Sequence, residues 1–327
     1  MKPNWQQILY ALFLGMMLPV FIFRFSSVFQ NQPGTPQTDA TQSLHSQPTE
    51  QPPMPAEIPV LADDDMVLMD MDTYLVGVVL AEMPASFEPE ALKAQAIVAR
   101  TYAWKRCQDA DHHSQGAVCT DSNCCQAYIS MQDYLKELGT QEDVDKITQA
   151  VLETTGQVLT YQGNLAEATY FSCSGGRTED AAAVWGSEIP YLQAVDSPGE
   201  EWASVFIHTV TFTASEFASA LGKGLSGDPK SWLGTATRSE GGGVATMVLA
   251  GQQYTGVQLR KILGLNSTAF TIVFKNGKFV VTTKGKGHRV GMSQYGADAM
   301  AVQGSSCQEI LSHYYPGTVI DKMNVLE

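Results

Sequence analysis

The sequence predicts an α+β fold, in which a mixed α/β domain carries a second, smaller lobe. Apolar residues recur at helical spacing from Tyr74 to Arg106, which indicates two helices separated by a turn. Short alternating segments such as Gln157–Tyr161 are typical of strands. Between residues 270 and 283, two further strands flank Asn276-Gly277, a pair that strongly favours a hairpin turn. At 327 residues, the chain is long enough for one large domain or two modest ones.

Composition excludes some classes of partner. The formal net charge of −14 argues against binding to nucleic acid and to anionic lipid surfaces. The charge is compatible with a glycan ligand, because sugars are bound by hydrogen bonds and by stacking on aromatic rings. Six cysteines are too few to build a disulfide-held scaffold of this size.

The N-terminal region predicts a membrane anchor followed by a linker. Residues 1–7 form a short cytoplasmic end, and the charge-free segment Ile8–Phe23 falls within a transmembrane signal anchor at residues 8–25. The alternative is a cleaved signal peptide, but the small-x-small cleavage pattern is missing after the apolar segment. Residues 26–62, rich in Pro, Gln and Thr, predict a flexible linker, and residues 63–320 form the predicted folded domain.

The most informative stretch is the pair of helices, with Glu82 at the end of the first. Thr73 is expected to cap that helix, Pro84 to end it, and Pro89 to occupy the first position of the second helix. Glu82 lies in the last turn among apolar residues, where the helix dipole and burial both disfavour a charged carboxylate. Both effects raise its pKa, as a general acid near neutral pH requires. The alternatives are a solvated carboxylate or an ion pair with an arginine such as Arg100.

The polar excursion at residues 107–130 predicts a metal site. Its imidazole and thiols lie close enough in sequence to converge on one ion, and this donor set suits tetrahedral zinc. The candidate ligands are His113, Cys119, Cys124 and Cys125, with His112 as a substitute for His113. A local disulfide or free thiols are the alternatives, since the spacing is not that of a standard zinc finger.

The remainder of the chain supplies loops suited to ligand binding. One helix is expected over Met131–Thr155, and short strands then lead into the glycine-rich loop Ser172–Arg177. Such a loop offers backbone N–H groups and little bulk to an approaching sugar. Residues 205–265 are predicted as the second lobe. Further on, His288 lies on a glycine-bracketed loop, and a helix is expected over Met292–Val302.

Four motifs in this chain resemble those of the SpoIID/LytB family. The first is GVVLAEMP followed by EALKAQAIVARTYA in the helix pair, and the others are SCSGGRT, GVQLRKILGL and GKGHRVGMSQYGADAMA. The resemblance runs from about Met66 to Tyr315. It implies lytic cleavage of the glycan strands of peptidoglycan during spore formation, with Glu82 as the catalyst. Relatives usually have glycine where Arg289 stands.

The same resemblance implies the remainder of the site and its setting. Substrate contacts are expected from Arg100, Ser174, Gly175, Gly176, His288, Gln294 and Tyr295. The catalytic domain is expected outside the cytoplasm, between the mother-cell and forespore membranes. A cell-wall amidase and membrane scaffold proteins of the engulfment machinery are the expected partners. The zinc is expected to be structural, with no cofactor required for the chemistry.

One carboxylate suffices for the implied reaction. Glu82 would protonate the glycosidic oxygen and then accept the proton of the sugar's own 6-hydroxyl, which closes a 1,6-anhydro ring on N-acetylmuramic acid. Hydrolysis usually needs two carboxylates, for which Glu167 and Glu179 are the nearest candidates. The alternative functions are a hydrolytic muramidase and a non-catalytic glycan-binding scaffold that recruits a partner hydrolase.

Overall fold

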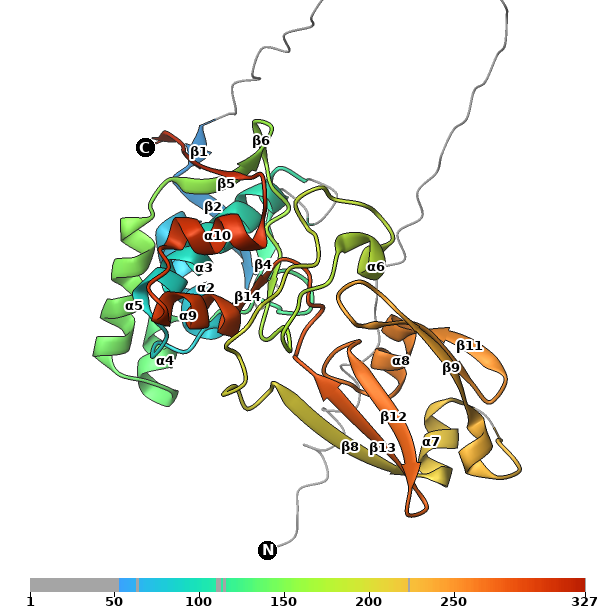
Figure 1. Cartoon of the computed structure of the whole chain (residues 1–327). Coiled ribbons are helices and arrows are strands. Elements are labelled where there is room, and N and C mark those ends of the chain that lie inside the picture. Colours follow the sequence, from blue (N-terminus) through green and yellow to red (C-terminus); the bar gives the residue numbers. More distant parts are fainter. Residues whose placement is uncertain (1–52, 63–64, 110–112, 114–115, 223, 327) are drawn as a thin grey trace, which may run out of the picture. The chain divides into compact units, whose positions relative to one another are not determined.

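The computed structural model describes residues 53–62, 65–109, 113, 116–222 and 224–326. These residues form a mixed α+β domain with several small sheets (Figure 1). The predicted anchor at 8–25 lies outside the described residues, as does most of the predicted linker. Within the described part of the chain, no helix combines the length and apolar character that a membrane crossing needs.

The last residues of the predicted linker belong to the folded domain. β1 (Met54–Pro55) pairs with β16 (Val325–Leu326), and β2 (Glu57–Ala62) pairs with β3 (Asp65–Asp70). β4 (Val118–Cys119) completes the second of these sheets on the other side of β2. The side chains of Ile58 and Val60 are fully buried. The linker prediction therefore extends too far, because two alternating apolar residues suffice to anchor a strand that the Pro-rich composition conceals.

The two central helices form as expected, except for the cap of the first. α2 spans Met71–Glu82, and its N-cap is Asp70, whose carboxylate accepts the Thr73 backbone N–H at 2.7 Å, so that Thr73 itself lies inside the helix. α3 spans Pro89–Cys107, with Pro89 at its first turn as predicted. α2 is buried along nearly its whole length, since every residue from Tyr74 to Leu80 is buried.

Arg100 and Asp72 form a buried ion pair that ties these helices together. The Arg100 side chain has no exposed surface, and its Nη2 lies 2.9 Å from Asp72 Oδ1. Its remaining hydrogen bonds go to the Thr154 hydroxyl and to the backbone carbonyls of Val151, Thr154 and Gln157. The resemblance implies a sugar contact for Arg100; the structure instead gives this side chain a structural role, because no part of it is accessible.

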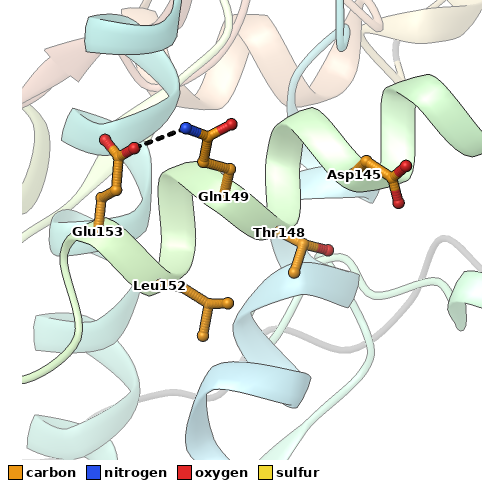
Figure 2. Close-up of a pocket in the computed structure, with 5 residues that line it drawn as sticks. All are labelled: Asp145, Thr148, Gln149, Leu152 and Glu153. Carbon is orange, nitrogen blue, oxygen red and sulfur yellow. Dashed lines mark hydrogen bonds between the residues drawn. The ribbon is translucent and has the colours of Figure 1, made fainter.

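Two helices, and not one, follow the Cys/His loop. α4 spans Met131–Glu137, and α5 spans Gln141–Glu153. Thr140 starts α5 with a reciprocal capping box, which competes with a continuous helix across this point. The hollow in Figure 2 lies on α5, and it is lined by Asp145, Thr148, Gln149, Leu152 and Glu153. It contains none of the predicted site residues.

The segments before and after the second lobe pair with each other in the main part of the domain. Their short strands form two sheets, one of order β15-β5-β6 and one of order β14-β7. Their bounds are β5 Gln157–Tyr161, β6 Asn164–Leu165, β7 Tyr170–Phe171, β14 Met292–Ser293 and β15 Val319–Lys322. The helices of this part are α6 Ala181–Trp185, α9 Gln294–Val302 and α10 Cys307–Tyr314, of which α6 and α10 have no counterpart in the sequence prediction. α9 and α10 both contact α3.

A second hydrophobic core marks the smaller lobe, whose elements are yellow to orange in Figure 1. It contains two three-stranded sheets, of order β11-β10-β9 and β12-β13-β8. The elements are β8 Ile207–Thr213, α7 Ala214–Ala220, η2 Pro229–Trp232, β9 Leu233–Arg238, β10 Val244–Leu249, β11 Gln252–Thr255, α8 Gly256–Ile262, β12 Phe270–Lys275 and β13 Lys278–Lys284. The lobe extends beyond the predicted limit of residue 265, because β13 pairs along its length with β8.

We expect Arg100→Ala to destabilise the protein by about 3–5 kcal/mol, since it leaves Asp72 partly buried without its partner. Unfolding in urea at pH 7 measures this cost. Arg177→Ala is the control: the carboxylates that Arg177 pairs with, on Asp196 and Glu240, are largely exposed. Its cost should stay within about 1 kcal/mol. Equal costs for the two variants would contradict the structural role of Arg100.

Candidate functional site

Glu82 lies at the C-terminal end of α2, where it receives hydrogen bonds from two distant segments. The Ala127 backbone N–H donates to Oε1 at 2.9 Å, and Gln294 Nε2 donates to Oε2 at 3.3 Å. Burial raises the pKa of Glu82 above its usual value, while hydrogen bonds from Ala127, Gln294 and Tyr170 offset part of that rise. Glu82 is therefore closer to protonation at neutral pH than an exposed carboxylate, as the sequence predicts.

Gln294 and Tyr295 form the first turn of α9 and reach the Glu82 region as expected. Ser293 caps this helix through its hydroxyl, which accepts the Gly296 N–H at 3.3 Å. Gln294 is buried and contacts Glu82 directly, whereas the Tyr295 ring packs against Phe87 with centroids 5.1 Å apart. Two segments that are far apart in the sequence therefore meet at one carboxylate.

The glycine-rich loop is organised around Glu200, a residue that the sequence did not single out. One carboxylate oxygen, Oε2, accepts the backbone N–H groups of Ser174 and Gly175 at 2.9 and 3.0 Å, and the Ser174 hydroxyl at 2.8 Å. Gly176 N–H donates to the Ser174 hydroxyl at 2.9 Å. The expectation that these N–H groups are open to a sugar is therefore wrong, since they bind partners inside the protein.

The other oxygen of Glu200 connects this loop to α9. Oε1 accepts the hydroxyls of Ser197 and Ser293 at 2.7 and 2.5 Å, and Ser293 is the residue that caps α9. Glu200 is fully buried. A lone glutamate in a loop carries no recognisable sequence pattern, so only the folded chain reveals that it fixes the start of the helix that bears Gln294.

Arg289 adopts a backbone conformation that favours glycine, the residue that the family resemblance leads us to expect at this position. Its φ of 69° lies in the left-handed region. Its buried guanidinium bridges the loop and the second lobe: it pairs with Glu179 at 3.1 Å and donates to the Ser174, Arg177 and Gly241 carbonyls. These interactions compensate for the strain of the positive φ.

Neither candidate for a second catalytic carboxylate contacts Glu82. Glu179 is paired with Arg289 and also accepts the Gly243 N–H and the Ser239 hydroxyl. Glu167 pairs with Arg106 at 2.5 Å and with Lys105 at 3.4 Å. Both carboxylates are held by cations inside the fold, which leaves Glu82 as the candidate general acid.

His288 is an uncharged residue packed against two aromatic rings. Its ring lies between those of Phe171 and Trp185, with centroids 5.6 and 5.5 Å away, and its Nδ1 accepts the Val290 N–H at 3.1 Å. Burial, with a smaller contribution from the charge of Arg260, lowers the pKa of His288 to about 4. The imidazole is thus neutral at pH 7 and suited to holding its neighbours in place.

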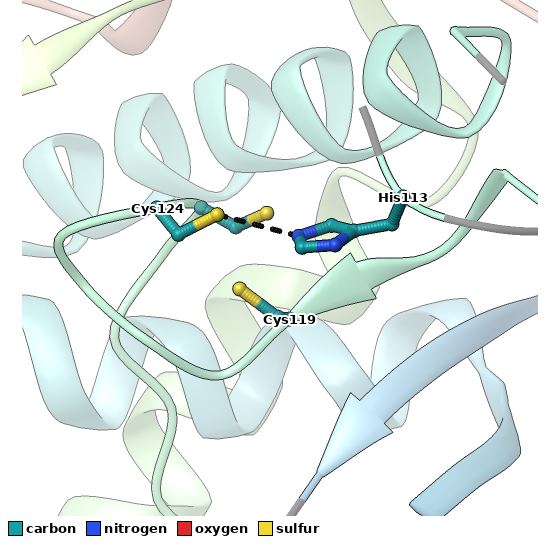
Figure 3. Close-up of side chains that lie close together, drawn as sticks. His113, Cys119 and Cys124 are labelled. Carbon is teal, nitrogen blue, oxygen red and sulfur yellow. Dashed lines mark hydrogen bonds between the residues drawn. The ribbon is translucent and has the colours of Figure 1, made fainter. Parts of the chain in front are cut away.

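The Cys/His loop brings its four candidate ligands together. The ligand atoms of His113, Cys119, Cys124 and Cys125 all lie within 4.8 Å of one another. In Figure 3 the Cys124 sulfur faces the ring of His113, whose Nε2 lies 3.3 Å from Cys124 Sγ, and the Cys119 sulfur lies close to both. The structure contains no disulfide between any of the six cysteines. His112 lies outside the described residues.

This cluster could hold a metal ion, and its position connects it to Glu82. Burial raises the pKa of Cys124 and of Cys125, and the neighbouring Cys119 thiol raises it further. Three close sulfur atoms of this kind favour a bound cation, which stabilises thiolates. Ala127, which donates to Glu82, follows Cys125 closely in the chain. Anything that fixes the cluster therefore also fixes one of the donors to Glu82.

The depressed pKa of His288 makes stability depend on pH in a defined direction. An unfolded histidine titrates near 6.5, so between pH 6.5 and about 4 the unfolded chain binds more protons than the folded protein. The stability that the folded protein gains from keeping His288 neutral is fully present above pH 6.5 and is lost as the pH falls toward 4. We expect the wild type to lose on the order of 3 kcal/mol more than His288→Gln over this range.

Urea unfolding at pH 7 and pH 4 measures this difference. His208→Gln, a substitution at an exposed position, is the control and should follow the wild type. If His288→Gln loses as much stability between pH 7 and pH 4 as the wild type does, the burial of a neutral His288 is not the cause of that loss.

Comparison with known proteins places these features in one family. The family model described as stage II sporulation protein matches residues 64–161, which include Glu82 and the Cys/His cluster. Stage II sporulation protein D of Bacillus subtilis (strain 168) is 42% identical over 275 residues, covering 82% of this chain and 80% of that protein. The protein of the same name from Bacillus amyloliquefaciens is 40% identical over 274 residues, covering 82% and 79%.

A more distant relative shares the same region. The amidase enhancer of Bacillus subtilis (strain 168) is 29% identical over 308 residues, which cover 75% of this chain and 40% of that protein. The two relatives named stage II sporulation protein D match over most of their own length as well as most of this one. The chain therefore belongs to the stage II sporulation protein D family, SpoIID.

Proposed function

We propose that this protein is a lytic transglycosylase that cleaves the glycan strands of peptidoglycan at the bond from N-acetylmuramic acid to N-acetylglucosamine. The observation that carries the proposal is the position of Glu82. It is a partly buried carboxyl group at a helix end, with a raised pKa, and Gln294 of a distant signature motif donates to it. A single acid in such a setting suits a reaction that needs one group to give and then take a proton.

In this mechanism Glu82 acts twice. Protonated Glu82 donates its proton to the glycosidic oxygen while the bond from that oxygen to C1 of N-acetylmuramic acid breaks. The 6-hydroxyl oxygen of the same sugar then bonds to C1, and its proton passes to the Glu82 carboxylate. Glu82 ends protonated as it began, no water is consumed, and the product carries a 1,6-anhydro end.

The side chains around Glu82 support this cycle. Ala127 N–H and Gln294 Nε2 hold the two carboxyl oxygens in place through both protonation states. Tyr170, whose hydroxyl donates to Gln126 at 2.9 Å, also lies within hydrogen-bonding reach of Glu82. Gln294, Tyr295 and the solvent-facing parts of the Gly175-Gly176 turn are the proposed sugar contacts, whereas His288 packs against Phe171 and Trp185.

Two other functions remain distinguishable by experiment. A muramidase would use water and leave reducing ends, and it would need a second carboxylate, for which Glu167 and Glu179 are poorly placed because both are held in ion pairs. A scaffold that binds glycan and recruits a hydrolase is the second candidate, since a relative carries the name amidase enhancer.

We also propose the setting in which the protein works. The segment at residues 8–25 would anchor it in the membrane as a single span, with the domain outside the cytoplasm between the mother-cell and forespore membranes. Peptidoglycan strands are its proposed substrate, and a cell-wall amidase and membrane scaffold proteins its proposed partners in engulfment. The net charge of −14 makes nucleic acid an unsuitable ligand.

Zinc is the metal that we propose for the Cys/His cluster. One imidazole and three thiols within 4.8 Å provide the number and type of ligands that a closed structural zinc site uses. All four ligand positions would be filled by protein, so no open position would be left for chemistry. The metal would fix the loop that carries Ala127 and take no part in the reaction.

Glu82→Gln is expected to lower the cleavage rate by about a hundred- to ten-thousand-fold, because it removes proton transfer but keeps shape. Mass spectrometry of products from purified, peptide-free glycan strands measures both rate and chemistry, and 1,6-anhydro ends are expected from the wild type. Reducing ends would support the muramidase. If the wild type binds glycan but does not cleave it, the scaffold function is supported.

The control for this variant is Glu88→Gln. Glu88 lies in the same loop region, but its side chain is exposed. Its contacts are made by the backbone: its N–H donates to Asp298 at 2.7 Å, and its carbonyl accepts the N–H groups of Ala91 and Leu92. The Glu88→Gln variant should cleave at the wild-type rate. Glu90 is a less suitable control, since its carboxylate accepts the Cys307 N–H at 2.7 Å. If Glu82→Gln retains full activity, another group is the acid.

We expect one zinc per chain by elemental analysis of protein purified without a metal-binding tag. Cys124→Ser should lose the metal, whereas Cys307→Ser, outside the cluster, should keep it. Chelation should lower the melting temperature, because the binding free energy of a structural metal contributes to folding. A metal-free protein with Cys119 in a disulfide, found by mass mapping, would refute the site.

A further inference from the structure

Trp202 is a large apolar side chain that is exposed yet held in a fixed orientation. It retains 59% of its accessible surface. Its ring meets that of Tyr295 at a centroid distance of 5.0 Å and that of Phe87 at 6.1 Å, both in edge-on geometry. Phe87 and Tyr295 also contact each other. Three mutually packed rings fix the orientation of Trp202 while most of its surface remains open to a ligand.

The rings that hold Trp202 belong to the two segments that form the Glu82 site. Phe87 lies in the loop that joins Glu82 to α3, and Tyr295 follows Gln294, whose Nε2 is 3.3 Å from Glu82 Oε2. The exposed Trp202 ring therefore packs against a residue from each of the two segments that form the Glu82 site.

The backbone of Trp202 is fixed as well. It lies two positions after Glu200, the buried carboxylate that binds Ser174, Ser197 and Ser293, and the turn is closed by a hydrogen bond from Ala203 N–H to the Glu200 carbonyl at 2.9 Å. Trp185, the other exposed tryptophan of the described residues, instead lies against His288 and has no such connection to Gln294.

We propose that Trp202 is the stacking platform of a sugar subsite beside Glu82, which binds the pyranose ring of an N-acetylated hexosamine. The axial C–H bonds of such a ring carry partial positive charge and fit the negative π face of the indole. This inference rests on the proposed function, because it takes the glycan strand as the ligand. It adds a binding residue outside the family motifs quoted above.

Binding is measured in the Glu82→Gln background, so that cleavage does not consume the ligand. The probe is peptide-free glycan strand, and bound protein is quantified by co-sedimentation. Adding Trp202→Ala should weaken binding roughly tenfold, the loss expected for one stacking contact. Trp202→Phe keeps an aromatic face and should stay within about threefold. Val302→Ala removes another exposed apolar side chain, at the far end of α9, and should change nothing.

The outcomes separate this inference from the proposed function. Equal binding by the Trp202→Ala and parent proteins would overturn the platform, and so would failure of Trp202→Phe to restore binding, with folding checked by circular dichroism. The proposed function is decided independently, by anhydro ends in the products of the protein with Glu82 intact. In that protein, Trp202→Ala should raise KM more than it lowers kcat, since stacking stabilises bound substrate and transition state alike.

Discussion

The buried carboxylate of Glu200 is the interaction on which the geometry of the candidate site depends. It accepts hydrogen bonds from the Ser174-Gly175 turn through one oxygen and from Ser197 and Ser293 through the other. A buried charge needs such donors, because an unsatisfied carboxylate in the interior is strongly unfavourable. Meeting that need forces a glycine-rich loop and the first turn of α9 into one fixed arrangement.

Burial also gives Glu82 its chemical character. α2 is enclosed by the core along nearly its whole length, with the Asp72–Arg100 pair near its first turn and Glu82 at its last residue. A helix fixed in this way holds its terminal carboxylate partly out of water. The protein therefore retains a raised pKa at Glu82, which disfavours the charged form in the folded state and equips the group for proton transfer.

Several local predictions failed where a tertiary contact opposed the local pattern. Residues 53–62 have a linker-like composition, but Ile58 and Val60 find a buried place beside β3 and β4. The break within Met131–Thr155, in contrast, is local, because Thr140 and Asp143 form a capping box that interrupts the periodic pattern. Arg100 belongs to a family motif, yet its partners are Asp72, the Thr154 hydroxyl and backbone carbonyls. Sequence spacing does not reveal which side chains the interior will enclose.

The sequence by itself determined the mixed α and β character, the helix that ends at Glu82, the Asn276-Gly277 hairpin and the four residues of the Cys/His cluster. These features depend on local periodicity, turn chemistry and short spacing, which the chain carries wherever it folds. Tertiary structure decided which distant groups meet: Gln294 and Ala127 at Glu82, the serines at Glu200, and Arg289 with Glu179. Such contacts arise from long-range packing and the need to satisfy buried polar groups, and neither leaves a mark in local sequence.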